Sequence, residues 1–234
     1  FVQIPEPHME KKSASAEKSK HSPWSFRHFV LGAIGIFVYV GIEVGIPGTL
    51  NLFLADPNGL AMPAAAAGSV VGTYWFLMLI GRFIGASIGA KISSKGMVGF
   101  ASGLGFILVL AAIFMPTTTT VSMPAFQSDI SFALAQVPIS AMLLVLCGFC
   151  TSVMWGGIFN MAVEGLGKYT AAASGFFMVM VCGGGILPAV QNAIADNAGY
   201  MASYWVIIAC FVYLLYYSFF GSKNVNTDIP VESV

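Results

Sequence analysis

Charged side chains are scarce in this sequence. Of its 234 residues only 9% are charged and 57% are apolar, whereas a soluble domain carries about a quarter charged residues. The ten basic and ten acidic residues balance, and the basic ones lie in segments between apolar runs rather than on one polar face. This pattern offers no surface for nucleic acid, which we do not expect as a partner. The composition indicates a membrane protein.

Cysteine is also rare, and its positions exclude a disulfide framework. The four cysteines lie inside apolar runs, where a thiol behaves as a small apolar side chain. They are Cys147, Cys150, Cys182 and Cys210. The first two have CxxC spacing, but no second CxxC and no nearby histidine accompany them. We therefore expect no metal site and no redox cofactor.

The sequence has few of the residues that build enzyme active sites. Its three histidines, His8, His21 and His28, precede or border the first apolar run. The runs contain no HExxH motif and no Ser/His/Asp set. An enzyme is therefore not expected.

The amino-terminal segment lacks both a starting methionine and a signal peptide. The first residue is Phe1, and no apolar core or cleavage site follows it. Residues 1–26 are rich in Lys, Ser, Glu and Pro and have too few large apolar side chains to fold alone. We predict a flexible cytoplasmic linker here, and we expect the chain to be part of something longer.

Six apolar runs follow this segment. Each is close to the ~20 residues that a helix needs to cross roughly 30 Å of hydrocarbon, and a helix satisfies its own backbone hydrogen bonds in lipid. We place them at about 29–54, 65–90, 96–116, 138–161, 171–194 and 201–221. The sequence therefore predicts an all-α membrane protein, with a six-helix transmembrane bundle over residues 27–222 and a cytoplasmic tail over 223–234.

The basic residues between the runs predict the orientation. Outside the runs, they precede the first run, follow the last, or lie in the loops near residues 93 and 166; they are Lys11, Lys12, Lys18, Lys20, Arg27, Lys91, Lys95, Lys168 and Lys223. The alternate loops carry none of them but contain Asp56, Asp129 and Asp196. By the positive-inside rule both termini are cytoplasmic. The Thr/Ser/Pro-rich stretch at 116–131 is then an outward-facing loop.

Glycines recur at helical spacing in the first two runs. They are Gly41, Gly45 and Gly48 in the first run and Gly81, Gly85 and Gly89 in the second. Small residues at this spacing let membrane helices approach closely. Tight helix packing without chemistry is the interpretation we favour for them.

The first run also contains a carboxylate, Glu43, which costs at least ~2.5 kcal/mol at the centre of a membrane helix. Tyr39 and Glu43 share the face opposite the glycines. Pro47 weakens the helix one turn later, and Asn51 is a further polar group. Glu43 is a ligand or proton carrier in a cavity, a structural partner for a cation, or a carboxyl kept neutral by burial. Because Arg82 lies towards the cytoplasmic end of its own run, no direct pair between the two is expected.

Two later runs carry further polar candidates. The fifth contains Gly183, Gly184, Gly185 and Pro188, which predict a broken helix of the kind found at transporter binding sites. Gln191 and Asn192 follow them, with amides able to bind a hydroxylated ligand.

The fourth run has Trp155 at mid-span and Asn160 about a turn later. The indole ring either stacks on the apolar face of a sugar or fills a packing gap. Both alternatives remain open.

Three segments together resemble a known family. FVYVGIEVGIPGTL, IGRFIGASIGAKISSKG and FNMAVEGLGKYTAAASGFFMVMVCGGGILPAV are similar to the carboxy-terminal half of major facilitator superfamily transporters, specifically the fucose/glucose/galactose-proton symporters. The resemblance covers nearly all of residues 27–221. It implies alternating access between two six-helix halves, with the missing amino-terminal half carrying the main proton-coupling carboxylates. It also implies that Arg82 forms a cytoplasmic gate, the alternative being a side chain that reaches the headgroups.

These observations lead to one hypothesis and a competitor. We expect half of a plasma-membrane sugar transporter, in a bacterial inner membrane, with hexose or fucose as substrate, protons as coupling ion and no bound cofactor. The expected substrate-binding residues are Glu43, Tyr39, Asn51, Trp155, Asn160, Gln191 and Asn192. The competing hypothesis is a membrane scaffold that packs through its glycines and transports nothing.

Overall fold

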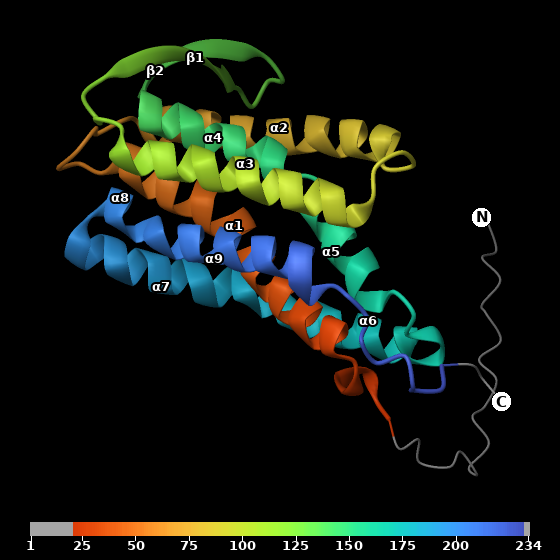
Figure 1. The fold of residues 1–234 in the computed structure, drawn as a ribbon. Coiled ribbons are helices and arrows are strands. Elements are labelled where there is room, and N and C mark those ends of the chain that lie inside the picture. Colours follow the sequence, from red (N-terminus) through yellow and green to blue (C-terminus); the bar gives the residue numbers. More distant parts are fainter. Residues whose placement is uncertain (1–20, 232–234) are drawn as a thin grey trace, which may run out of the picture.

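Long helices dominate the computed structural model, which describes residues 21–231 (Figure 1). Six helical spans in this part of the chain are long and apolar enough to cross a membrane, so the predicted six-span fold is confirmed. The first three spans are single helices, α1 (Arg27–Ala55), α2 (Ala64–Ile88) and α3 (Ser94–Phe114). The predicted linker over residues 1–26 lies mostly outside the described residues.

The last three spans are interrupted helices. The fourth consists of α4 (Ile139–Thr151) and α5 (Met154–Val163). The fifth consists of η2 (Gly167–Tyr169), α6 (Thr170–Val179), η3 (Met180–Cys182) and α7 (Gly183–Ala198). The sixth consists of α8 (Tyr200–Ser203), α9 (Trp205–Tyr216) and the π-helical turn η4 (Tyr217–Gly221).

The predicted break in the fifth span exists, but the glycines do not form it. The 3₁₀ turn at Met180–Cys182 separates α6 from α7. Gly183 begins α7, and Pro188 lies inside that helix. Gly183 instead allows close packing, since a Cβ at this position would lie 2.6 Å from the carbonyl carbon of Phe37 in α1.

One β-hairpin stands outside the helical pattern, where the sequence predicted a loop. Strands β1 (Thr120–Phe126) and β2 (Phe132–Pro138) pair antiparallel, with Thr120 opposite Pro138 and Phe126 opposite Phe132. The Thr- and Pro-rich composition hid the strands, because it gives no clean alternation of apolar and polar residues.

The hairpin is anchored on α2. The rings of Phe126 and Phe132 pack against Phe76, with centroids 5.0 and 5.2 Å away. The backbone N–H of Phe126 donates to Thr73 Oγ1 at 2.9 Å. The hairpin is therefore held to the bundle by both apolar and polar contacts.

The turn of the hairpin has hydrogen bonds of its own. Those that the Ser131 hydroxyl and backbone N–H donate to Asp129 lower the pKa of this carboxyl.

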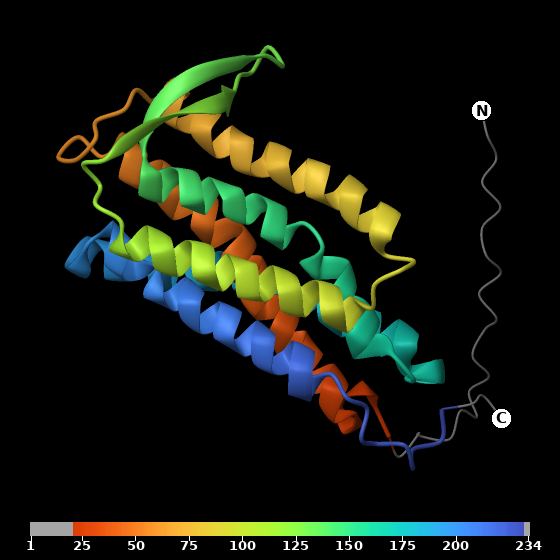
Figure 2. The ribbon, with the colours of Figure 1, turned by 45° about the horizontal axis from the view of Figure 1, so that its top comes forward.

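The two ends of the bundle differ. The start of α1 and the end of η4 lie at one end, hereafter the terminal end, and the β-hairpin lies at the other, the hairpin end (Figures 1 and 2). Apart from Arg82, the basic residues of the described part lie at or next to the terminal end: Arg27, Lys91, Lys95, Lys168 and Lys223. The charge segregation expected from the sequence is thus built into the fold.

The carboxy-terminal segment packs back onto the terminal end. Asn226 Oδ1 accepts a hydrogen bond from the backbone N–H of Arg27 at 2.9 Å. The carbonyl oxygen of Val231 accepts one from the N–H of Lys168 at 3.0 Å. Residues 223–231 of the predicted tail therefore connect the start of α1 with the turn before α6.

Helix α1 is the most buried of the six spans. Its glycine face packs on α7, where Gly41 meets the side chain of Leu187 and Gly45 meets that of Gln191. Gly48 belongs to the same predicted stripe, but a methyl group added there would have no atom of the described residues within 4 Å. The prediction of close helix packing therefore applies to Gly41 and Gly45 and not to Gly48.

Helix α2 packs closely on the fourth span through Gly81 and Gly85. A Cβ on Gly81 would overlap the Ser152 side chain, and one on Gly85 would overlap Val153. From the other side, a Cβ on Gly148 would lie 3.0 Å from the carbonyl carbon of Tyr74. These glycines bring α2 against the junction of α4 and α5, which places Arg82 beside that junction.

Candidate functional site

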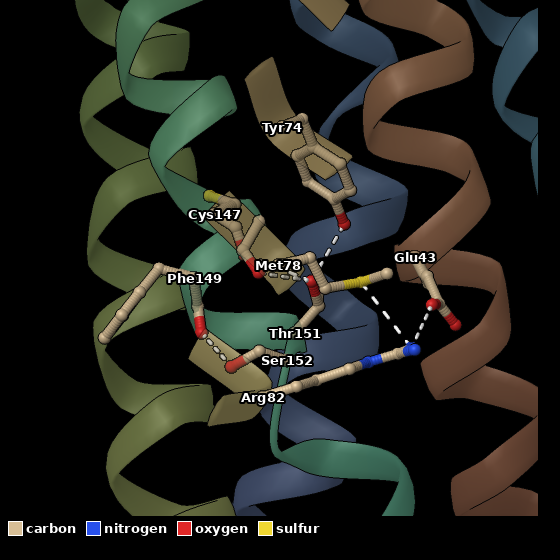
Figure 3. Close-up of polar contacts among 9 residues, drawn as sticks. Glu43, Tyr74, Met78, Arg82, Cys147, Phe149, Thr151 and Ser152 are labelled. Atoms are coloured by element: carbon tan, nitrogen blue, oxygen red, sulfur yellow. Dashed lines mark hydrogen bonds and ion pairs between the residues drawn. The ribbon is translucent and has the colours of Figure 1, made fainter. Parts of the chain in front are cut away.

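An ion pair joins α1 to α2 in the middle of the bundle. Arg82 Nη2 lies 3.4 Å from Glu43 Oε1 (Figure 3), and this is the one salt bridge found among residues 21–231. The expectation that Glu43 and Arg82 do not pair directly was therefore wrong.

Side-chain direction explains this correction. At 1.5 Å per residue, Glu43 lies about 18 Å from the hairpin end of α1, and Arg82 about 27 Å from that of α2. Helical side chains lean towards the amino terminus of their helix. Because the two helices are antiparallel, Arg82 leans towards the hairpin end and Glu43 towards the terminal end. The two side chains thus approach each other across a difference in backbone depth.

The ion pair is asymmetric in its exposure. The Arg82 side chain is 52% exposed, whereas that of Glu43 is 14% exposed. A single nitrogen makes the contact, and the same nitrogen lies 3.9 Å from Met78 Sδ. Apart from these contacts and the nearby Tyr39 hydroxyl, the guanidinium donors have no polar partner within the described part of the chain. Arg82 therefore keeps donors free for a ligand or for another protein surface.

Aromatic side chains lie next to the pair. Tyr39 is one turn before Glu43 on the same face of α1 and close to both charges. Its ring meets that of Trp155 edge to face, with centroids 6.2 Å apart. The hydroxyl of Tyr39 is buried close to the Glu43 carboxylate and the Arg82 guanidinium, although it forms no hydrogen bond of normal geometry with any described residue. Of the predicted site residues, the structure therefore brings Tyr39, Glu43, Arg82 and Trp155 together.

Two adjoining hollows open beside Arg82. Both are lined by Arg82, Ser152 and Gly156; one of about 430 Å³ also contains Trp155, and one of about 190 Å³ reaches Asn160. Ligand sites for small molecules have volumes of roughly 300–1,000 Å³. The hollows are large enough in combination to form part of such a site.

The interruption between α4 and α5 shapes the wall of these hollows, and it was not predicted from the sequence. The hydroxyl of Ser152 donates to the Phe149 carbonyl oxygen at 2.6 Å. The hydroxyl of Thr151 lies 3.1 Å from the Gly148 carbonyl oxygen and 3.0 Å from the Tyr74 hydroxyl (Figure 3). These side chains satisfy carbonyls at the end of α4. A Thr-Ser pair followed by β-branched Val153 was the available signal.

Gln191 and Asn192 lie on the other side of α1. Gln191 is fully buried against Gly45, and neither polar atom of its amide has a hydrogen-bond partner among the described residues. Asn192 Oδ1 accepts a hydrogen bond from Thr49 Oγ1 at 2.9 Å. Since Gly45 is about 200° around the helix from Glu43, these two amides do not line the Arg82 hollows.

The remaining predicted residues are exposed. Asn160 Nδ2 donates a long hydrogen bond of 3.5 Å to Ser94 Oγ. Asn51 lies about two turns from Glu43 towards the hairpin end of α1, and it is exposed. Residues 21–231 hold no group of three or more His, Cys, Asp or Glu side chains that is arranged to bind a metal.

Comparison with known proteins finds sugar transporters. The chain is 33% identical to a glucose/galactose transporter of Brucella abortus. The matched region covers 92% of this chain and 47% of that protein. It is 29% identical to a putative glucose/galactose transporter of Helicobacter pylori and 23% identical to the L-fucose-proton symporter of Escherichia coli. No family model matches the chain. The predicted resemblance is thereby confirmed, and these relatives are transporters rather than enzymes.

Structural comparison agrees with the sequence relatives. The chain superposes on a crystal structure of the major facilitator superfamily transporter FucP in the outward conformation with a TM-score of 0.70 at 22% identity. The match covers 85% of this chain and 43% of that one. The chain spans about half the length of the relatives that it matches, and its fold is that of the carboxy-terminal half of such a transporter.

Proposed function

We propose that this chain is the carboxy-terminal half of a sugar transporter that works by alternating access, with a hexose or fucose as substrate and protons as the coupling ion. The observation that carries the proposal is the Glu43–Arg82 ion pair beside an open hollow, in a chain whose relatives are named as sugar transporters. An ion pair at this depth is expensive to maintain in a membrane helix. Its presence beside a hollow supports a functional role.

The chemistry of the site suits a neutral polyol. Glu43 oxygens accept hydrogen bonds from sugar hydroxyls, and the free donors of Arg82 bind hydroxyl oxygens. The half-buried indole of Trp155 offers an apolar face for the C–H side of a sugar ring. Asn160 supplies an amide at the far side of the second hollow. We assign these four residues, with Tyr39, to the half of the binding site that this chain provides.

We propose that proton coupling uses the same pair. Protonation of Glu43 removes its charge and with it the attraction to Arg82. The half-exposed guanidinium is then free to meet a sugar, a backbone carbonyl or a carboxylate of the amino-terminal half. We propose that this exchange of partners links proton binding to the rocking of the two halves.

The proposal includes the membrane and a sidedness. The terminal end, with its basic residues, faces the cytoplasm of a bacterial inner membrane, as the positive-inside rule predicts. Single cysteines introduced at Asp129 in the hairpin turn and at Lys168 at the terminal end test this in whole cells lacking other reactive thiols. A membrane-impermeant maleimide should label the first and not the second, and the reverse labelling would contradict the orientation.

The transport proposal is tested in proteoliposomes that contain the full protein. We expect saturable uptake of glucose, galactose or fucose that is driven by a proton gradient. Glu43→Gln should lower proton-driven uptake at least about tenfold, because it removes the titratable group and the ion pair. Asp196→Asn, an exposed acid in α7, is the matched control and should transport normally.

Two results would contradict this proposal. Absence of saturable sugar binding in protein that is folded would favour the membrane scaffold. Unchanged proton-driven uptake in Glu43→Gln would remove Glu43 from the mechanism while leaving sugar transport intact.

A further inference from the structure

A third and larger hollow lies at the terminal end, away from the Glu43–Arg82 pair. Its volume is about 850 Å³. Four segments line it: the first turn of α3, the end of α5 with the following turn, η4, and the residues directly after η4. The charged and aromatic members of this lining are Lys95, Lys223, Glu164, Phe219 and Phe220.

Two lysines give the hollow its basic character. Lys95 Nζ donates to the carbonyl oxygen of Phe219 at 3.1 Å, which fixes the ammonium group at the wall and leaves its other donors available. Lys223 has no ion-pair partner within residues 21–231. The one carboxylate of the lining, Glu164, makes no salt bridge there either. The hollow therefore carries an excess of one positive charge.

Neutral donors complete the polar wall. Ser94 and Asn160 contact each other across the hollow at 3.5 Å, and Asn224 lies in the segment below η4. The hollow includes the first turn of α3, whose N–H groups add a favourable dipole for an anion. Hydroxyl, amide and ammonium donors in one concave surface form a suitable environment for phosphate oxygens.

Two aromatic side chains connect the hollow to the exposed outer surface of the bundle. Phe219 and Phe220 line it and are 51% and 72% exposed. Both lie in η4, the last turn of a membrane-crossing span. A molecule that fills this hollow therefore has a polar group among the lysines and an apolar part along the outer surface of the bundle. A phospholipid has this division, whereas a free anion uses only the polar part.

We propose that the terminal-end hollow binds the phosphate group of an anionic phospholipid, with Lys95 and Lys223 as the charged ligands and Phe219 and Phe220 along its acyl chains. Glu164 lowers the affinity by repelling the phosphate. The site shares Asn160 with the proposed sugar site, but its charged and aromatic ligands are separate, and it stands whether or not the chain transports sugar. The hollow lies at an end of the bundle that would move if the two halves rock. A bound lipid would stabilise the arrangement of α3, α5 and η4 that forms the hollow.

Binding is measured by native mass spectrometry of the detergent-purified protein with dioleoyl phosphatidylglycerol and, separately, dioleoyl phosphatidylcholine. We expect phosphatidylglycerol to bind about tenfold more tightly. Lys95→Gln combined with Lys223→Gln should remove this preference. Lys91→Gln, a basic residue at the same end but outside the hollow, is the matched control and should keep it. Glu164→Gln should strengthen phosphatidylglycerol binding.

Several results would overturn the proposal. They are equal binding of the two lipids to the unsubstituted protein, an equal loss in Lys91→Gln, and competition by inorganic phosphate at the same concentration as phosphatidylglycerol, which would indicate a free-anion site. Because Lys95→Gln also breaks a hydrogen bond to η4, Lys223→Gln alone is measured as well. It should lose a smaller part of the preference with an unchanged unfolding temperature, and full retention there would also count against the site.

Discussion

The two faces of α1 differ in almost every physical respect although they belong to one 29-residue helix. One face carries Tyr39 and Glu43, with an ion pair to α2 and a hollow beside it. The other carries Gly41 and Gly45, which bring α7 into contact. A single helix thus carries an ion-paired carboxylate on one face and a closely packed glycine seam on the other.

The two faces of α1 also place polar groups in different surroundings. Gln191 lies at the glycine seam and is buried without a hydrogen-bond partner among the described residues. Glu43 is charged, yet it has a partner, Arg82, and that partner lines a hollow. Access to space and to a second charge, rather than polarity alone, distinguishes the candidate site from the packing seam.

The largest expected effect comes from removing the cation on the polar face. Arg82→Gln leaves Glu43 largely buried without its partner, and breaking buried pairs costs about 3–5 kcal/mol. Because Arg82 is half exposed, we expect a smaller loss of stability than this. We expect proton-driven sugar uptake to decrease about tenfold, because Glu43 loses its partner. Arg27→Gln at the terminal end is the charge-matched control, and an equal decrease there would show that the effect is not specific to the pair.

At the packing seam the expected effect is on stability rather than on uptake. Gly183→Ala places a methyl group against the backbone of Phe37, and such overpacking costs about 1–3 kcal/mol. Gly185→Ala meets open space and should leave stability unchanged or slightly raised. Thermal unfolding in detergent measures both. Equal unfolding temperatures for the two variants would show that α1 and α7 are not tightly packed.

Gln191→Leu tests whether the buried amide in the packing seam has a function. It removes an amide that is buried without partners and keeps a similar volume, so we expect a stabilisation of up to about 1 kcal/mol with normal sugar uptake. Uptake that falls together with sugar affinity, in a variant of unchanged stability, would return Gln191 to the substrate site.

The smallest structural effect is expected at Tyr39. Its hydroxyl makes no hydrogen bond among the described residues, so Tyr39→Phe should change the free energy of unfolding by less than about 0.5 kcal/mol. If the hydroxyl binds sugar, KM for uptake should rise about fivefold, the loss of roughly one hydrogen bond. An unchanged KM would leave Tyr39 a packing residue.

Much of the fold was predictable because membrane helices require long apolar runs. The six spans, the Gly41–Gly45 seam and the weakness in the fifth span follow from local sequence. The Glu43–Arg82 pair was not predictable from depth alone, since it depends on the opposite lean of side chains in antiparallel helices. The placement of Gln191 behind α1 depends on how α7 is rotated, and the hairpin depends on its contacts with Phe76 and Thr73. Tertiary packing decides all three.

A double-substitution cycle tests whether Glu43 and Arg82 act as one unit in proton-coupled sugar uptake. Glu43→Gln, Arg82→Gln and the double variant are compared in the same proteoliposomes by initial uptake rate, with protein amount and fold checked for each. If the pair is the functional unit, the double variant loses no more activity than the worse single variant. Losses of activity that multiply would show that Glu43 and Arg82 contribute independently, and this would contradict their action as one unit.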